Sequence, residues 1–446
     1  MGTPSSSPKA TSKARKPQAE GAKAPAGPAA AGKRPGRPQV EAAKGRAVGP
    51  GETDAGAIPA GGAEAAIEPK VVEGKGPYAA RLARLSGVIA GQSLGHLLVT
   101  NPLDVAYLTG FLGGDSYLLV GADGKSVLLS DFRFEEELEP IRKARLARVV
   151  IRSRGLLDAT ADLLIEARAS EVGLQAEHVT LAQRESLVKA LGARGLKSAA
   201  KALAATTGLI AGMREIKDAG EVRLIRKAIE IQEQALLAVL PTIQAGQPER
   251  VIAALLEAEM KSLGSSAPGF ETIIAARANG SLPHYRAGDT KVALREPLLI
   301  DWGAVYKGYH GDMTRTFSLV KWPAEIAEIY SVVLEAHEAS AAALKAGVTT
   351  GEVDAIARGI IDKAGFGERF GHGLGHGIGL QGHEDPRLSP MASSVELRAG
   401  HVVTIEPGIY LPGVGGVRIE DCYLVTEKGA TNLCSLPKDA GWSTLT

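Results

Sequence analysis

The strongest constraint on this chain is a set of four acidic residues and one histidine in its last third. The set comprises Asp301, Asp312, His376, Glu406 and Glu420. Asp301 follows Pro-Leu-Leu-Ile and Glu406 follows Val-Val-Thr-Ile, which are typical of buried strands, although acidic side chains are usually exposed. Carboxylates and an imidazole form a hard, oxygen-rich site that favours Mn²⁺ or Co²⁺ and tolerates Zn²⁺ or Fe²⁺. We therefore predict that these residues bind two divalent metal ions through bridging carboxylates.

The first two carboxylates are predicted to point the same way from one hairpin. Lys307 and Gly308 are typical of a two-residue turn between two β-rich runs. This turn pairs Asp301 with Thr314, and it places Asp312 opposite a residue on the Asp301 face. Side chains alternate between the faces of a strand, and cross-strand partners share a face. Asp301 and Asp312 should therefore be diagonal neighbours.

The second pair of carboxylates is predicted to behave in the same way. We interpret residues 412–416 as a loop of about five residues, a common hairpin length. Such a loop pairs Glu406 with Cys422 and Glu420 with Gly408, so both glutamates lie on one face. The two hairpins can then enclose a site for two metal ions. The competing interpretation, ordinary acidic side chains on a solvated face, fits poorly with the apolar residues that precede them.

Around these residues the chain resembles the pita-bread metallopeptidases, which include methionine aminopeptidase, aminopeptidase P, prolidase and the metal-free creatinase. The matching segments, which span nearly all of residues 212–430, are MREIKDAGEVRLIRKA, LPHY, DWGAVYKGYHGDMTRTF, HGLGHGIGL, HEDP, TIEPGIY and GVRIEDCYLVT. The resemblance implies that Asp301 binds one metal ion, that Asp312 and Glu420 bridge the two ions, and that His376 and Glu406 bind the second. Creatinase does not keep this full set of ligands, which argues against a creatinase activity.

Catalytic roles also follow from the resemblance. His284 is expected to contact the substrate beside the scissile bond, and His383 to stabilise the tetrahedral intermediate or pass protons. Arg418 is expected to orient a metal ligand, and Glu406 to accept the proton of the attacking water and deliver it to the leaving nitrogen. His372 lies four residues before the predicted metal-binding histidine, but the interleaved glycines disfavour the helix of a zincin motif. We expect His372 only to line the pocket.

Residues 77–205 alternate between helix and strand patterns, which predicts a three-layer α/β domain. Helices are expected at 78–90, 133–144 and 158–169, and strands at 96–101, 116–123, 125–131, 147–153 and 172–177. This domain resembles the N-terminal domain of creatinase, prolidase and aminopeptidase P, especially at NPLDVAYLTGF and LLSDFRFEEELEPI. Methionine aminopeptidases lack such a domain, so the proline-directed branch of the family is favoured.

Residues 204–212 are predicted to link this domain to an α+β pita-bread catalytic domain over residues 212–446. Amphipathic helices are expected at 219–243, 248–263, 323–344 and 350–364, the last with a capping box from Thr349 to Glu352. These helices should lie outside the antiparallel hairpins that present the acidic residues.

Residues 1–76 contain no Leu, Phe, Tyr or Trp, so they can bury too little apolar surface to fold, and we predict a disordered tail. Its twelve basic and seven acidic residues allow weak contacts with nucleic acid or anionic surfaces, but a solvated tail without function is the simpler interpretation. We find no apolar signal region and no stretch of membrane-spanning length. With only two cysteines, the chain suits a reducing cytoplasm.

The resemblance implies a metal-dependent exopeptidase that uses a hydroxide, activated by two metal ions, to cleave the N-terminal Xaa-Pro bond of peptides, as aminopeptidase P does. The expected substrate has proline at its second position, the expected metal is Mn²⁺ (with Co²⁺ or Zn²⁺ as alternatives), and a homodimer is expected. The alternative is an Xaa-Pro dipeptidase, or prolidase, which needs a group that captures the carboxylate of a dipeptide. A metal-free protein-binding relative is a third class, and the full ligand set argues against it.

Overall fold

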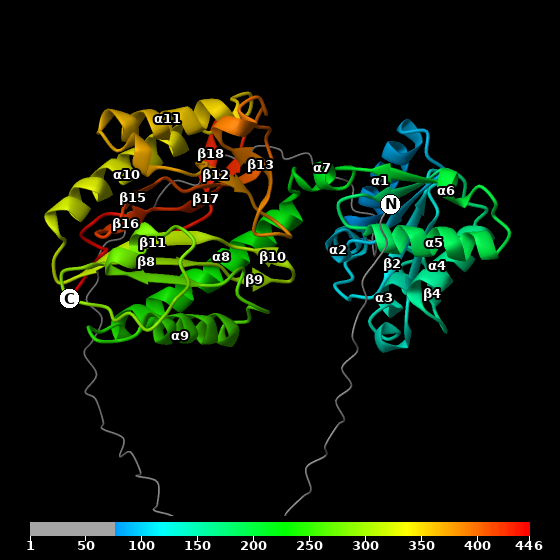
Figure 1. Cartoon of the computed structure of the whole chain (residues 1–446), viewed down its shortest axis with the longest axis horizontal. Coiled ribbons are helices and arrows are strands. Elements are labelled where there is room, and N and C mark those ends of the chain that lie inside the picture. Colours follow the sequence, from blue (N-terminus) through cyan, green and yellow to red (C-terminus); the bar gives the residue numbers. More distant parts are fainter. Residues whose placement is uncertain (1–75) are drawn as a thin grey trace, which may run out of the picture. The chain divides into compact units, whose positions relative to one another are not determined.

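The computed structural model describes residues 76–446, so the tail predicted for residues 1–76 lies outside the described residues, apart from Gly76. The N-terminal domain is built around a six-stranded sheet in the order β4-β3-β2-β1-β5-β6 (Figure 1). Strand β2 is antiparallel to β1 and β3, and the other neighbouring strands are parallel. The strands are β1 (His96–Val99), β2 (Tyr117–Gly121), β3 (Ser126–Ser130), β4 (Arg148–Ile151), β5 (Val172–Gln175) and β6 (Leu203–Thr206).

Helices connect these strands. They are α1 (Tyr78–Gly91), α2 (Pro102–Thr109), α3 (Glu139–Lys143), α4 (Leu156–Glu166), α5 (Leu181–Ala193) and α6 (Ala199–Ala202), with the 3₁₀ helix η1 (Phe132–Phe134). The buried faces of the sheet are lined by apolar side chains such as Leu97, Leu118 and Leu128, which have no exposed surface. The alternation of strands and helices confirms the α/β fold predicted for this domain.

Two details of the predicted N-terminal domain are wrong. The helix expected at 133–144 is reduced to η1 and the short α3, because Pro140 lacks an N–H and can occupy only the first turn of a helix. The linker expected from residue 204 begins later, because residues 203–206 form β6, which pairs with β5 at the edge of the sheet. The boundaries of the domains stay a prediction.

The remaining residues form the second domain, for which a catalytic role is predicted, and its helices begin close to the predicted positions. They are α7 (Ala211–Arg214), α8 (Ala219–Val239), α9 (Glu249–Ser262), α10 (Ala324–Ala343) and α11 (Thr350–Lys363), with 3₁₀ helices η2 (Leu240–Thr242), η3 (Arg277–Ser281), η4 (Gly367–Arg369) and η5 (Pro390–Ala392). The predicted capping box of Thr349 and Glu352 is present at the start of α11. Within residues 76–446, no helix is long and apolar enough to cross a bilayer.

The strands of this domain form two larger sheets, β19-β11-β8-β7 and β13-β12-β14-β17-β18, and two small hairpins, β9-β10 and β15-β16. Figure 1 shows α8 and α9 along one side of the strands and α10 and α11 along the other, which confirms the predicted pita-bread arrangement. The strands are β7 (Ile273–Ala276), β8 (Pro297–Trp302), β9 (Val305–Tyr306), β10 (Tyr309–His310), β11 (Met313–Leu319), β12 (Gly375–Gly377), β13 (Glu384–Leu388), β14 (Val402–Ile405), β15 (Gly408–Leu411), β16 (Gly415–Arg418), β17 (Asp421–Val425), β18 (Ala430–Asn432) and β19 (Thr444–Leu445).

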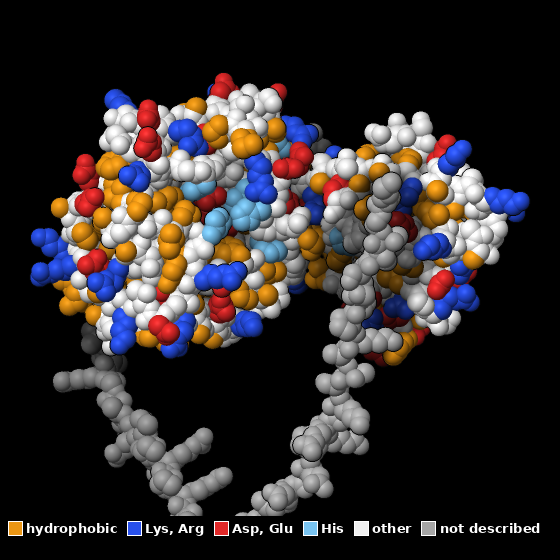
Figure 2. Space-filling model, viewed as in Figure 1, with side chains coloured by type: hydrophobic (Ala, Val, Ile, Leu, Met, Phe, Trp, Pro, Cys, Tyr) orange, Lys and Arg blue, Asp and Glu red, His pale blue; other side chains and the backbone are white. Residues whose placement is uncertain are grey.

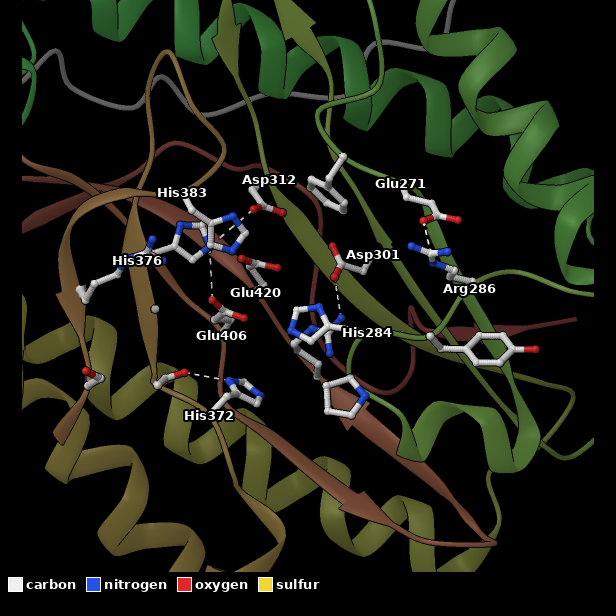
Figure 3. A pocket seen from close by; sticks show the side chains of 18 residues that line it. Glu271, His284, Arg286, Asp301, Asp312, His372, His376, His383, Glu406 and Glu420 are labelled. Carbon is white, nitrogen blue, oxygen red and sulfur yellow. Dashed lines mark hydrogen bonds and ion pairs between the residues drawn. The ribbon is translucent and has the colours of Figure 1, made fainter. Parts of the chain in front are cut away.

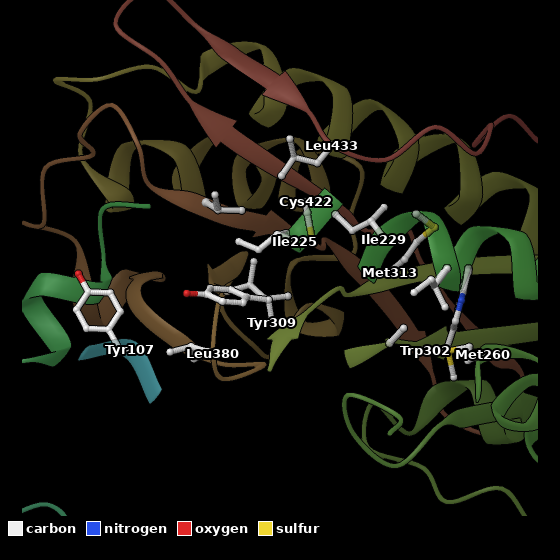
Figure 4. Packing of buried hydrophobic residues seen from close by; sticks show 14 of the residues in the cluster. Tyr107, Ile225, Ile229, Met260, Trp302, Tyr309, Met313, Leu380, Cys422 and Leu433 are labelled. Atoms are coloured by element: carbon white, nitrogen blue, oxygen red, sulfur yellow. The ribbon is translucent and has the colours of Figure 1, made fainter. Parts of the chain in front are cut away.

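Two apolar clusters hold the helices against the strands. In the first, Ile225 and Ile229 of α8 pack with Tyr309, Met313 and Cys422 of the strands (Figure 4). In the second, α10 and α11 pack against β14 to β17. Because the strands are covered on both sides, the directions of their side chains are fixed by burial.

The predicted register is right for the first hairpin and wrong for the second. Asp301 pairs with Thr314 as expected. In the second, Gly408 pairs with Arg418 and Cys422 pairs with Thr404, so the register differs by two residues from the prediction. The turn is shorter because Gly413 adopts a φ of +81°, a conformation that favours glycine. A shift of two residues leaves every side chain on its predicted face.

Candidate active site

The five residues predicted to bind metal come together from separate strand ends. Asp301 lies on β8, Asp312 directly precedes β11, His376 is central in β12, Glu406 directly follows β14, and Glu420 lies between β16 and β17. Figure 3 shows the four carboxylates gathered in one pocket with the histidine at their side. Asp312, His376 and Glu420 are buried, and the side chains of Asp301 and Glu406 are only 11% and 17% exposed.

Three of these side chains lie within reach of a single metal ion. Ligand atoms of Asp312, His376 and Glu420 all lie within 4.8 Å of one another. The Nε2 atom of His376 is 3.7 Å from Asp312 Oδ2 and 3.4 Å from Glu406 Oε1. Its Nδ1 atom is 3.0 Å from the carbonyl oxygen of Gly377. The ring can donate that N–H to the carbonyl, which leaves the Nε2 lone pair for a cation.

Asp301 is oriented by Arg418. The Arg418 guanidinium donates to Asp301 Oδ2, and its Nε donates to the Thr314 hydroxyl at 3.0 Å. The other oxygen of Asp301, Oδ1, is buried and has no hydrogen-bond partner within residues 76–446. A buried carboxylate oxygen without a partner is unfavourable unless a cation binds it. The residues therefore fit the divalent metal ions that the sequence predicts.

The clustered carboxylates hold their protons strongly. Burial raises the pKa of Asp312 well above its ordinary range, and the neighbouring Asp301 and Glu406 raise it further. Burial and the nearby Asp312 do the same to the pKa of Glu420. Burial also raises the pKa of Glu406 to about 8, although Arg418 opposes this shift. Like charges confined in a buried pocket become fully ionised only when cations balance them.

A cavity of about 470 Å³ contains this cluster, and the two histidines predicted to contact substrate line it. Figure 2 shows histidine side chains around a hollow with acidic side chains inside. The rings of His376 and His383 are stacked with their centroids 3.9 Å apart. His284 and His383 are both exposed to the cavity, so each can reach a bound molecule. Burial lowers the pKa of His383, which favours its neutral form.

Two residues at this site were not predicted from the sequence. The Tyr410 hydroxyl accepts from Arg418 Nη1 at 2.9 Å and lies 2.8 Å from Nε2 of His372, which lines the cavity as expected. Tyr410 lies four residues after Glu406, so strand alternation could have indicated their common face. Arg387 lines the cavity because it pairs directly with His376 across β12 and β13. No local pattern indicates that pairing.

Comparisons with known proteins account for both parts of the chain. Residues 223–427 match the metallopeptidase family M24, and residues 81–216 match the creatinase/prolidase N-terminal domain. An Xaa-Pro dipeptidase from Pyrococcus furiosus is 36% identical over 365 residues, which cover 80% of this chain and 99% of that protein.

Solved structures agree with this assignment. An Xaa-Pro dipeptidase from Bacillus anthracis matches with a TM-score of 0.76 and 32% identity, covering 81% of this chain and 98% of that one. An X-Pro aminopeptidase from Thermotoga maritima matches with a TM-score of 0.71 and 34% identity, covering 80% and 99%. The resemblance seen in the motifs is thereby confirmed. The chain belongs to metallopeptidase family M24, as a metallopeptidase with a creatinase/prolidase N-terminal domain.

Proposed function

We propose that this metallopeptidase is an Xaa-Pro dipeptidase that works with two divalent metal ions, of which Mn²⁺ is the expected species. Among the similar proteins, those from P. furiosus and B. anthracis are named Xaa-Pro dipeptidases. These names support the dipeptidase, which was the alternative from the sequence, over the aminopeptidase, which was its first interpretation. The observation that carries the choice is the position of Arg387 in the pocket.

Arg387 offers the group that a dipeptidase needs. Cross-strand partners share a face, so its guanidinium emerges on the same face as the imidazole of His376. It lines the cavity and forms no ion pair within residues 76–446. A free guanidinium beside the reacting centre suits a carboxylate, which it can bind with two parallel hydrogen bonds. In a dipeptide, that carboxylate is the C-terminus of the proline.

The other residues take roles that follow from their positions. Asp301, Asp312, His376, Glu406 and Glu420 would hold the two ions. When bound, these ions would lower the pKa of a water molecule and polarise the scissile carbonyl. Glu406 accepts the proton of the attacking water and passes it to the proline nitrogen.

Two histidines and an arginine support this chemistry. His284 and His383 donate hydrogen bonds to the carbonyl oxygen as negative charge develops on it. Arg418 keeps Asp301 in place. The nitrogen of an Xaa-Pro bond carries no N–H, so the pocket needs no acceptor at that point and can select the proline ring by shape.

The test compares an Xaa-Pro dipeptide, its C-terminal amide and a tripeptide that extends it, with Mn²⁺ present. The dipeptide should be the best substrate, because only its carboxylate can reach Arg387. Arg387→Met should lower kcat/KM for the dipeptide by about tenfold to hundredfold, the range expected for losing hydrogen bonds to a charged group. The same change should have little effect on the amide.

Arg286 provides a matched control, because it also lines the cavity but is paired with Glu271 at 3.1 Å. Arg286→Met should leave the preference for the dipeptide in place. Faster hydrolysis of the tripeptide, together with an unchanged rate for Arg387→Met, would instead favour the aminopeptidase. That second candidate is supported by the similarity to the X-Pro aminopeptidase of T. maritima. The homodimer and the cytoplasmic location stay predictions from the sequence.

A further inference from the structure

His284 depends on its neighbours in the chain for its position. Its ring forms no hydrogen bond or ion pair within residues 76–446, although it lines the pocket near the carboxylates (Figure 3). It lies after η3, in a segment that belongs to no helix or named strand. A group that acts on substrate must be held accurately, and irregular segments need outside support for this.

A single buried carboxylate gives that support. Glu249 lies in the first turn of α9 and has no exposed surface. Its Oε1 atom accepts from Ala276 N at 2.8 Å and from Asn279 Nδ2 at 2.9 Å. Its Oε2 atom accepts from the Tyr285 hydroxyl at 2.8 Å and from Gly288 N at 3.1 Å. All four donors come from the stretch of chain that contains His284.

The backbone joins the same two segments around this carboxylate. Glu249 N donates to Thr290 O at 3.0 Å, and Arg250 N donates to Gly288 O at 3.1 Å. A side chain at position 288 would disturb the arrangement, because a Cβ there would lie 3.2 Å from the Tyr285 hydroxyl oxygen. The start of α9 is therefore a rigid support for the residues on both sides of His284.

The surroundings of the Glu249 carboxylate stabilise it in its buried position. Its burial is unfavourable unless several donors satisfy both oxygens, and Glu249 has four. Its position at the start of α9 adds a favourable interaction with the helix dipole. Glu249 does not line the cavity, so it acts through other residues rather than on the substrate.

We propose that Glu249 is a positioning residue that holds His284 at the reacting carbonyl through Tyr285 and Gly288. This inference rests on the proposed function, in which His284 contacts the substrate. Loss of one Glu249 contact should then lower kcat, with little change in KM or in bound Mn²⁺. The effect should also require the His284 imidazole.

Two variants test the inference in the full-length protein with Mn²⁺. Tyr285→Phe removes one donor to Glu249 and keeps the ring, whereas Glu249→Gln keeps one accepting oxygen and replaces the other with an NH₂ group, which cannot accept. Each should lower kcat for an Xaa-Pro dipeptide by about tenfold or more, as small misplacements of reacting groups do. In a His284→Ala background the same changes should alter kcat by less than about twofold, because no imidazole remains for Glu249 to position. The effects of substitutions at interacting residues are not additive.

Arg250→Gln is the matched control. Arg250 forms an exposed ion pair with Asp289 at 2.6 Å, which joins the same two segments without touching Glu249. This variant should retain the wild-type kcat. Equal losses from Tyr285→Phe in both backgrounds, or no loss when His284 is present, would overturn the inference. A wild-type kcat for His284→Ala would show that the proposed role of His284 is wrong, and the inference would fall with it. Tyr285→Phe keeps the test open if Glu249→Gln does not fold.

Discussion

A carboxylate buried beside other carboxylates can keep a proton or bind a cation. Burial and neighbouring charges raise the pKa values of Asp312, Glu406 and Glu420. Burial has the opposite effect on His376, whose pKa is lowered to about 3. At neutral pH the imidazole is therefore ready to bind a metal ion, whereas the carboxylates must first release protons.

Binding of Mn²⁺ at pH 7 is therefore expected to release protons. Glu406 has a pKa raised to about 8, so it is mostly protonated at pH 7 and must ionise to bind a cation. The apparent affinity for Mn²⁺ should rise as the pH increases through about 8. Calorimetric titration in buffers of different ionisation enthalpy measures the release. The Glu406→Gln variant at saturating Mn²⁺ should release fewer protons, and equal release by both proteins would contradict the assignment.

Single residues were predicted well where their local setting was distinctive. Asp301 and Glu406 could be identified because each follows an apolar strand in which a carboxylate is unusual. Arg387 and Glu249 could not, because an arginine on a strand and a glutamate in the first turn of a helix are common. Their roles come from contacts with distant parts of the chain, which no local pattern contains.

At the scale of elements, glycines determine how closely β12 approaches its neighbours. A Cβ at Gly375 would lie only 2.0 Å from the carbonyl oxygen of Thr404 on β14. Thr404 also accepts from His376 N at 3.1 Å. The glycines around His376 disfavour a helix there. They also allow β12, which carries His376, to pack closely against β14, which leads to Glu406.

Gly375→Ala is expected to displace β12 and weaken both stability and metal binding. Overpacking at such a contact typically costs about 1–3 kcal/mol of the free energy of unfolding. Urea denaturation and Mn²⁺ titration measure the two effects. Gly371→Ala is the control in the same segment, because a Cβ there meets nothing within 4 Å. If both alanine variants behave like the wild type, the close approach of the strands is not required.

The register of β15 and β16 shows where prediction of elements from sequence ends. The alternation of residues fixes the faces of strands, so the shared face of Glu406 and Glu420 could be predicted. The length of the turn depends on a positive φ at Gly413, and glycine in a loop permits many conformations. The predicted pairing was wrong by two residues for that reason, and the conclusion about faces was unaffected.

At the scale of the whole molecule, buried ion pairs connect the N-terminal domain to the segment that carries His383. Arg214 Nη1 donates to Asp104 Oδ1 of α2 at 2.8 Å, and these residues are 110 positions apart in the sequence. Arg214 also pairs with Glu384, which accepts from Lys217 Nζ at 3.2 Å. Such a network could not be predicted, because it joins residues that lie far apart in the sequence.

Glu384→Gln is expected to destabilise the protein by about 3–5 kcal/mol, because it leaves two buried cations without their common partner. Burial alone would raise the pKa of Glu384, but Lys217 and Arg214 lower it overall. The carboxylate therefore stabilises the fold above its ordinary pKa of 4.5, and this contribution fades as the pH falls through the lower folded value. The difference between variant and wild type, measured by urea denaturation, should be largest at neutral pH and should shrink in acid.

Arg398→Ala gives the comparison for this last prediction. Arg398 pairs with Glu215, the neighbour of Arg214, at 2.7 Å, but its side chain is 54% exposed. Loss of such a pair should cost only about 0–1 kcal/mol, because water screens it. A Glu384→Gln variant no less stable than Arg398→Ala would show that the buried pairs do not hold the two domains together. If the prediction is correct, Glu384→Gln should also lower kcat. Glu384 directly follows His383 in the chain, so a displacement of Glu384 also displaces His383.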